Sequence, residues 1–161
     1  MKNIYTSMKK LLFLALAILS ISCQNNTNEA PKETQKIVHE VKLWQTDIDK
    51  ALKMSTKSGK PIFAFFTGKE WCGWCKKLDK QVLTQEAFKS YAEENLILLE
   101  LDFPRGKRDL PAKQIELARK FNIKGYPTVI LMDAHTNHIA TTGYEAMSPE
   151  EYVSHLQSLL N

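Results

Sequence analysis

The residues of this sequence that are best suited to chemistry are Cys72 and Cys75, which lie in the segment WCGWCKKL. A thiolate is the nucleophile of thiol–disulfide exchange, so two neighbouring cysteines can act as a redox pair. Their spacing of three places Cys75 one helical turn after Cys72, within reach of a disulfide bond. Cys23 stands apart from both, and we expect it to serve a different chemistry.

The elements around the pair are predicted to make Cys72 reactive. The apolar run PIFAFFT (61–67) is typical of a strand buried on both faces, and a helix is expected to begin at the pair. The first turn of a helix presents unpaired N–H groups and a partial positive charge, which stabilise a thiolate. We therefore expect Cys72 to attack a partner disulfide and Cys75 to resolve the mixed disulfide. Gly73 between them lets a partner backbone approach closely.

The remaining elements are predicted from capping residues and hydrophobic periodicity. Asp47 and Gly59 suit the start and end of a helix, and Ser148 before Pro149 suits the start of the last one. The predicted strands cover 41–44, 61–67, 95–103, 128–133 and 138–142, and the predicted helices cover 47–58, a segment from 72, 109–121 and a segment from 148. The last helix is expected to turn an apolar face to the core, made of Val153, Leu156 and Leu160. Strands that alternate with helices indicate a parallel sheet covered on both sides, and the closing hairpin adds an antiparallel edge.

The length and composition predict one globular domain that does not bind nucleic acid. The 161 residues are 43% hydrophobic and 25% charged, which suits a single hydrophobic core. The formal net charge is +4, but residues 1–22 carry three lysines and no acidic residue, which leaves 19 basic and 18 acidic side chains. A nearly neutral domain has no long-range attraction for nucleic acid, and we interpret Arg105, Lys107 and Arg108 as a solvated turn.

Residues 1–22 are predicted to be a signal peptide outside the fold. Lys9 and Lys10 precede the apolar run LLFLALAILSIS, which is shorter than the about 20 residues that span a bilayer. The run ends at Cys23 and resembles a bacterial lipoprotein signal, although Ser20 stands where Leu is usual. This resemblance implies that Cys23 is acylated and becomes the first residue of the mature protein. A plain secretory signal or an uncleaved anchor is the alternative.

The segment after this cysteine is interpreted as a tether. Residues 24–36 are polar and lack apolar periodicity, so the lipidated Cys23 and the tether (23–36) would join the lipid bilayer to a domain that spans 37–161. In lipoproteins of bacteria with two membranes, Asp after the cysteine commonly retains the protein at the inner membrane, so Gln24 favours the outer one. We expect a lipid-anchored, periplasm-facing protein of the bacterial cell envelope.

From its first helix onward the chain resembles the thioredoxin superfamily, and most closely the secreted bacterial thioredoxin-like branch. The resemblance is carried by GKPIFAFFTGKEWCGWCKKLDKQV and, further along the chain, by GYPTVILMD. It covers nearly all of residues 37–161. It implies the thioredoxin fold, which is an α/β fold with a central mixed β-sheet and helices on both faces.

The resemblance also implies roles for five residues of the site. Trp71 would shield the motif, Cys72 would be the nucleophile and Cys75 the resolving cysteine. Pro127 would be cis and would face the cysteine pair. The backbone of Tyr126 would receive a partner segment as an added strand.

The sequence departs from the family pattern around the motif. Thioredoxins carry a buried Asp on the strand before the cysteines, which assists proton transfer, whereas this strand reads FAFF (63–66). Glu70 is close in sequence, but we expect it to be exposed. Trp74 replaces the usual Pro between the cysteines, and Tyr126 replaces the usual Thr before the cis proline. Both changes add aromatic surface for partner binding, which favours restricted partners over those of a general thioredoxin.

We expect an extracytoplasmic thiol–disulfide oxidoreductase that uses no cofactor, acts on protein disulfides and receives electrons from a membrane partner. The resemblance favours a reductase over an oxidant. The alternative is a non-catalytic module that binds its partners through the aromatic face around Trp71, Trp74 and Tyr126. An inert structural disulfide is a further possibility. A zinc site is disfavoured because zinc takes four ligands and the four histidines of the chain, His39, His135, His138 and His155, are scattered.

Overall fold

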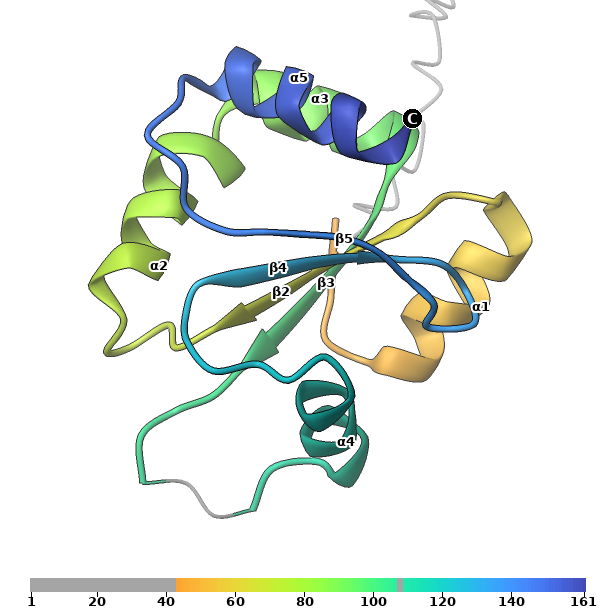
Figure 1. The fold of residues 1–161 in the computed structure, drawn as a ribbon, viewed down its shortest axis with the longest axis vertical. Coiled ribbons are helices and arrows are strands. Elements are labelled where there is room, and N and C mark those ends of the chain that lie inside the picture. Colours follow the sequence, from red (N-terminus) through yellow and green to blue (C-terminus); the bar gives the residue numbers. More distant parts are fainter. Residues whose placement is uncertain (1–42, 107–108) are drawn as a thin grey trace, which may run out of the picture. The chain divides into compact units, whose positions relative to one another are not determined.

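The computed structural model describes residues 43–106 and 109–161, in which a five-stranded sheet carries helices on both sides (Figure 1). The predicted signal peptide, Cys23, the tether and the beginning of the first predicted strand lie outside the described residues, as do Lys107 and Arg108. None of the helices in the described part of the chain has the length and apolar character needed to cross a membrane.

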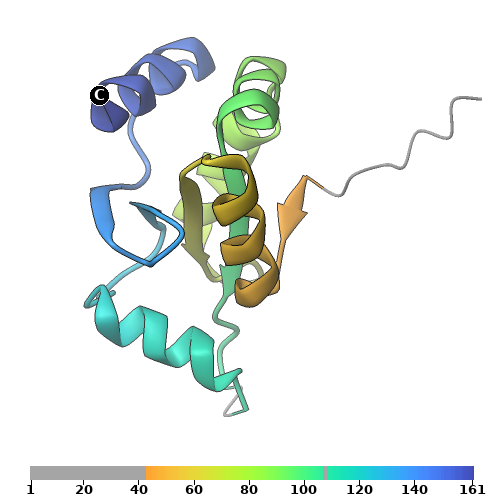
Figure 2. The same cartoon turned by 90° about the vertical axis from the view of Figure 1, so that its right-hand side faces the viewer.

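The sheet is mixed and has the strand order β1-β3-β2-β4-β5. Its strands are β1 (Trp44–Gln45), β2 (Ile62–Thr67), β3 (Ile97–Asp102), β4 (Thr128–Met132) and β5 (His138–Thr142). β1, β3 and β2 run parallel, whereas β4 is antiparallel to β2 and β5 is antiparallel to β4. β1 and β5 form the two edges of the sheet (Figure 2). The predicted α/β class and the closing hairpin are confirmed.

Helices cover both faces of the sheet, so β2 is buried along its whole length. The helical segments are α1 (Ile48–Ser58), α2 (Gly73–Leu78), the π-helical turn η1 (Asp79–Leu83), α3 (Glu86–Asn95), α4 (Ala112–Lys120) and α5 (Pro149–Leu160). Phe63 and Phe65 of β2 join a core cluster with residues of α2, η1, α3 and α5. Ala64 and Phe66 point to the other face and join residues of α1 and α4. This alternation follows from the two-residue period of a strand.

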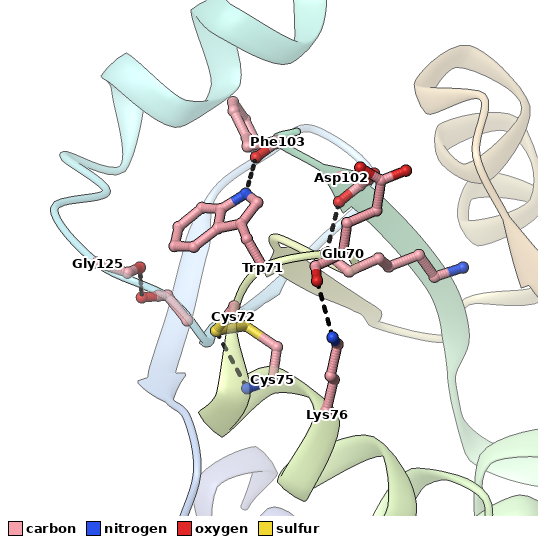
Figure 3. The surroundings of a disulfide bond; sticks show 10 residues. Glu70, Trp71, Cys72, Cys75, Lys76, Asp102, Phe103 and Gly125 are labelled. Atoms are coloured by element: carbon pink, nitrogen blue, oxygen red, sulfur yellow. Dashed lines mark hydrogen bonds between the residues drawn. A yellow bond between two sulfur atoms is a disulfide. The ribbon is translucent and has the colours of Figure 1, made fainter. Parts of the chain in front are cut away.

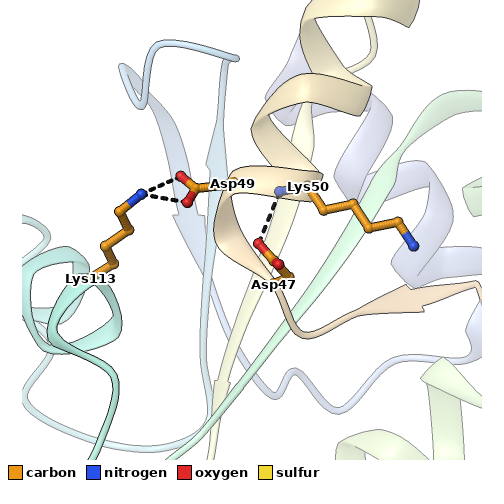
Figure 4. Close-up of polar contacts among 4 residues, drawn as sticks. All are labelled: Asp47, Asp49, Lys50 and Lys113. Carbon is orange, nitrogen blue, oxygen red and sulfur yellow. Dashed lines mark hydrogen bonds and ion pairs between the residues drawn. The ribbon is translucent and has the colours of Figure 1, made fainter.

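α1 begins and ends where its capping residues predict. The side chain of Asp47 accepts the N–H of Lys50 at 3.0 Å, and Gly59 follows the helix with a φ of 75°, in the left-handed region that favours glycine. Asp49 in the first turn pairs with Lys113 of α4 (Figure 4). α1 and α4 are therefore linked by an ion pair as well as by the core that they share.

α5 confirms its predicted start but buries a different stripe of side chains. Ser148 forms a capping box at its N-terminus. Tyr152 and Leu156 are completely buried, whereas Val153 and Leu160 are only partly buried. The predicted face is wrong at Val153. Residues four apart lie on the same side of a helix, so Tyr152 and Leu156 form the buried stripe, and Val153 lies beside it.

The segment between the motif and β3 differs most from the prediction. α2 continues into η1 instead of forming one regular helix, and α3 follows as a separate helix that the sequence interpretation omits. The last residue of α3 is Asn95, so the strand predicted from 95 begins only at Ile97. Phe88 and Ala92 of α3 are buried beside the sheet. α3 and α5 lie side by side over the face that carries the cysteines (Figure 1).

Candidate active site

Cys72 and Cys75 lie at the junction of β2 and α2 and are joined by a disulfide bond (Figure 3). The two sulfur atoms are 2.17 Å apart and the two Cα atoms are 5.2 Å apart. Cys72 is 5% exposed and Cys75 is 2% exposed. The structure is therefore the oxidised form of the pair, and Cys72 is the slightly more accessible member.

The two sulfur atoms have different hydrogen-bonding surroundings at the start of α2. Cys72 is the N-cap residue, and its Sγ accepts the backbone N–H of Cys75 at 3.1 Å. A hydrogen bond donated to sulfur stabilises the thiolate that reduction would leave on Cys72. Cys75 lies inside the helix, where its carbonyl oxygen accepts the N–H of Asp79. The geometry thus prepares Cys72, and not Cys75, to carry a negative charge.

Trp71 is fixed beside the pair by the turn that begins at Gly68. The carbonyl oxygen of Gly68 accepts the N–H groups of Trp71 and Cys72 at 3.0 and 2.7 Å. A β-carbon on Gly68 would lie 2.4 Å from the indole ring, so the ring packs where a side chain would stand. The indole Nε1 donates to the carbonyl oxygen of Phe103 at 2.8 Å (Figure 3). The sequence interpretation does not single out Gly68 or Phe103.

The loop before β4 brings Tyr126 against Trp71. The peptide bond between Tyr126 and Pro127 is cis, as the family resemblance implies. The ring of Tyr126 meets Trp71 edge-on, with centroids 5.6 Å apart, and lies 5.4 Å from the ring of Phe103. Burial in this aromatic cluster raises the pKa of the Tyr126 hydroxyl. Trp71 and Tyr126 both pack against the core cluster that contains the two cysteines.

Trp74, between the cysteines, points outward and is 58% exposed. Tyr144 packs against it, with ring centroids 5.2 Å apart and ring planes tilted by 38°. The Nζ of Lys77 lies over both rings, 5.0 Å from the centroid of Trp74 and 4.9 Å from that of Tyr144. The Tyr144 hydroxyl donates to Oε1 of Gln81 at 3.0 Å, which fixes its position. Tyr144 thus extends the aromatic surface that Trp74 begins.

Two carboxylates of β3 contact the turn that precedes the cysteine pair (68–71, the motif turn). The strand before this turn, β2, supplies none. Glu100 pairs with Lys69 at 2.8 Å, and Asp102 accepts the backbone N–H of Lys69, also at 2.8 Å. The hydrogen bond with Glu100 raises the pKa of Lys69. The side chain of Glu70 is exposed, as predicted. The place of the family's buried Asp is filled by apolar side chains of β2.

The described residues hold no group of three or more His, Cys, Asp and Glu side chains that could bind a metal ion. The rings of His138 and His155 instead share hydrogen bonds with the hydroxyls of Thr141 and Thr142, at 2.7 and 3.0 Å. These histidines support β5 and its contact with α5.

The structure gathers the residues that the sequence singles out at one end of the sheet. Trp71, Tyr126 and Tyr144 pack against the core cluster that contains both cysteines, and Trp74 contacts Tyr144. A β-carbon on Gly73 would meet nothing within 4 Å, so the surface beside the disulfide is open at this point. Arg105, interpreted from the sequence as part of a solvated turn, is exposed but lies over the ring of Trp71, 4.7 Å from its centroid.

A comparison with protein-family models finds the thioredoxin-like domain over residues 48–160. The chain is also similar to the disulfide bond reductase DsbH of Chlamydia pneumoniae, at 31% identity over 92% of this chain and 93% of the relative. A solved structure of the DsbH oxidoreductase superimposes with a TM-score of 0.66 at 36% identity, covering 73% of this chain and 83% of the other. The thiol:disulfide interchange protein DsbD of Yersinia enterocolitica is 26% identical over 92% of this chain, which spans only 25% of that relative.

Proposed function

The chain belongs to the family of thioredoxin-like domains and is a thiol–disulfide oxidoreductase, and from this premise we propose that it reduces protein disulfides outside the cytoplasm. The observation that carries the proposal is the Cys72–Cys75 disulfide, in which the Sγ of Cys72 caps the helix that contains Cys75. The direction is supported by the similarity to a disulfide bond reductase along nearly the whole length of both chains.

The proposed reaction starts from the reduced pair. The thiolate of Cys72 attacks one sulfur of a partner disulfide, which forms a mixed disulfide and releases the other partner sulfur as a thiolate that takes up a proton. Cys75 then loses its proton and attacks the Sγ of Cys72, which releases the second partner thiolate. Two electrons have passed to the partner, and the Cys72–Cys75 disulfide of the structure is the product left on the enzyme.

The residues around the pair are proposed to hold the partner while the sulfur atoms exchange. The backbone of Tyr126, which precedes β4 and whose ring lies against Trp71, would receive an extended partner segment as an added strand. The open surface at Gly73 admits the partner backbone, and Trp71 and Trp74 supply apolar contacts. No proton acceptor for Cys75 is assigned on β2, because its buried side chains include no carboxylate.

The location is proposed from the sequence, because the segments that determine it lie outside the described residues. Residues 1–22 would direct export, Cys23 would carry the acyl chains, and residues 23–36 would tether the domain of residues 37–161. Gln24 favours the outer membrane of the cell envelope, with the domain facing the periplasm. Each round of reduction leaves the pair oxidised, so the enzyme needs a dithiol donor, which we propose to be a membrane protein.

A reduction assay tests the proposed activity. We expect the protein to accelerate the reduction of insulin disulfides by dithiothreitol, and the double variant Cys72→Ser, Cys75→Ser to show no acceleration. A reduction potential near about −120 mV, in the range of strong oxidants, would reverse the proposed direction.

The exposed Trp74 also fits a second function, in which the aromatic face binds partners without turnover. The same double serine variant distinguishes the two functions in cells. If it retains biological activity, the binding module is correct and the enzymatic proposal is wrong.

A further inference from the structure

The aromatic pair of Trp74 and Tyr144 is an exposed surface whose contacts point to the kind of partner it receives. We call these two side chains, with the ammonium group of Lys77 over them, the capped platform. Trp74 is the most exposed large apolar side chain in the described part of the chain. Tyr144 packs against the core cluster that contains both cysteines, so the platform adjoins the redox pair.

Lys77 lies over the platform and forms no ion pair with an acidic side chain of the described residues. Its Nζ lies 5.0 and 4.9 Å from the two ring centroids, a geometry in which the ring faces attract a cation. The ion pairs of the described residues join Lys69 to Glu100 and Lys113 to Asp49, so Lys77 takes part in neither. Its charge therefore stays available to a group that approaches along the rings.

A second cation repeats this arrangement at the other tryptophan of the motif. The guanidinium of Arg105 lies 4.7 Å from the ring centroid of Trp71, and Arg105 likewise takes no part in the ion pairs of the described residues. Trp71 and Trp74, the two tryptophans of the motif, thus each have a cation over the ring face. A partner whose sulfur reaches the nearly buried Cys72 brings its neighbouring residues into this positive field.

From this geometry we propose that the site selects protein segments with an acidic side chain next to the reactive cysteine. The aliphatic part of that side chain lies on the rings of Trp74 and Tyr144, and its carboxylate pairs with Lys77. This inference deepens the proposed function and rests on it. A protein partner is favoured over a membrane surface because the platform adjoins the disulfide, where a partner sulfur has to arrive.

Small disulfide substrates test this selection directly. Three homodimeric disulfide peptides carry Glu, Gln or Lys next to the cysteine and are otherwise identical. For each peptide, the rate constant of reduction by the reduced protein is divided by the rate constant of reduction by dithiothreitol, which carries no charged group besides its attacking thiolate. This ratio removes the intrinsic effect of the neighbouring charge on the peptide sulfur. We expect this ratio of rate constants to be about fivefold higher for the Glu peptide than for the Gln peptide. One charge pair at about 4 Å in water contributes a factor of this size.

Variants of one residue locate the effect. Lys77→Gln should lower the preference to the small part that the charge of Arg105 provides, and Lys77→Glu should reverse it in favour of the Lys peptide. Lys53 is an exposed residue of α1, which covers the opposite face of the sheet, and Lys53→Gln should keep the full preference. In about 1 M salt the Debye length is about 3 Å, so the value for the Glu peptide divided by that for the Gln peptide should fall toward one.

Three results would overturn the proposal, and they differ in what else they contradict. Equal ratios for the three peptides, or a preference that Lys77→Glu leaves unchanged, contradict the selection but leave the redox function intact. Failure to reduce any of the peptides contradicts the proposed function as well. Sedimentation with vesicles of anionic phospholipid that Lys77→Glu abolishes, together with equal peptide ratios, would assign the platform to a membrane surface instead.

Discussion

The indole N–H of Trp71 donates a hydrogen bond to the carbonyl oxygen of Phe103 at a distance of 2.8 Å. This bond ties Trp71, the residue before Cys72, to the chain that leaves β3, a strand at the centre of the parallel part of the sheet. The same indole packs against Gly68 and Tyr126. The position of the turn before the cysteine pair is thus set by contacts from both sides of the site. Substitutions at these contacts should lower the stability of the protein.

Gly68→Ala should destabilise the protein, because a β-carbon would lie 2.4 Å from the ring of Trp71. Forcing extra atoms into such a contact typically costs about 1–3 kcal/mol. Urea unfolding of the oxidised protein measures the loss. Gly73→Ala is the matched control, since a β-carbon there meets nothing within 4 Å, and its free energy of unfolding should not fall. Equal losses in the two variants would contradict the proposed packing of Trp71.

Tyr152→Phe should lower stability by about 0.5–1.5 kcal/mol, the usual net value of one hydrogen bond. The hydroxyl of this buried residue donates to the carbonyl oxygen of Gly143 at 3.0 Å and so holds the chain that leads to Tyr144. Tyr91→Phe removes a less buried hydroxyl and should change stability less. Denaturant titration compares the variants, and a Tyr152→Phe protein as stable as the wild type would show that this bond contributes nothing.

The stability of the fold should fall in alkaline solution above about pH 10, and Tyr152→Phe should reduce this fall. Burial raises the pKa of Tyr152, and less strongly those of Tyr91 and Tyr126, above the ordinary value near 10. Above pH 10 the unfolded chain releases these protons while the folded chain keeps them. The folded state then binds more protons, so its stability decreases as pH rises. Unfolding free energies from pH 8 to 11 test this, and identical slopes for the variant and the wild type would contradict it.

Ser148→Ala should cost about 0.5–2 kcal/mol because it removes the N-cap of α5. The Ser148 hydroxyl accepts the N–H of Glu151 at 3.2 Å, and the Glu151 carboxylate accepts the N–H of Ser148 at 2.8 Å. Ser154→Ala, within the same helix and exposed, is the control and should be nearly neutral. Thermal unfolding measures both variants, and an equal effect would mean that the capping box does not stabilise α5.

The sequence predicts the fold well where local signals and global topology agree. Asp47 and Gly59 mark the ends of α1, and Ser148 and Pro149 mark the start of α5, because caps act within a few residues. The apolar run of β2 predicts a central strand because a fully buried strand needs no alternation. The proximity of Cys72 and Cys75 was also predictable, since a spacing of three places them one helical turn apart.

Other features depend on contacts between distant segments and leave little local trace. α3 is missing from the prediction although Phe88 and Ala92 have helical spacing, because the irregular turn η1 interrupts the pattern before it. The need for Gly at position 68 comes from the indole of Trp71, and the ion pair of Lys69 with Glu100 joins a loop to a strand. No local pattern in one sequence specifies which distant residues such side chains contact.

The capped platform likewise arises from separate segments. Trp74 and Lys77 are three residues apart on α2, a spacing that predicts proximity on a helix. Tyr144 comes from the loop after β5, and only the tertiary structure brings it against Trp74. The sequence therefore predicts aromatic surface at Trp74, whereas the contact with Tyr144 follows only from the tertiary structure.

Trapping the mixed disulfide tests the central claim most directly. The Cys75→Ser variant keeps Cys72 at the N-cap of α2 but lacks the thiol that releases a bound partner. Exported in cells and separated without reductant, this variant should carry partner proteins that dithiothreitol releases, and the Cys72→Ser variant should carry none. The account is contradicted if Cys75→Ser traps no partner while its Cys72 also resists alkylation near neutral pH.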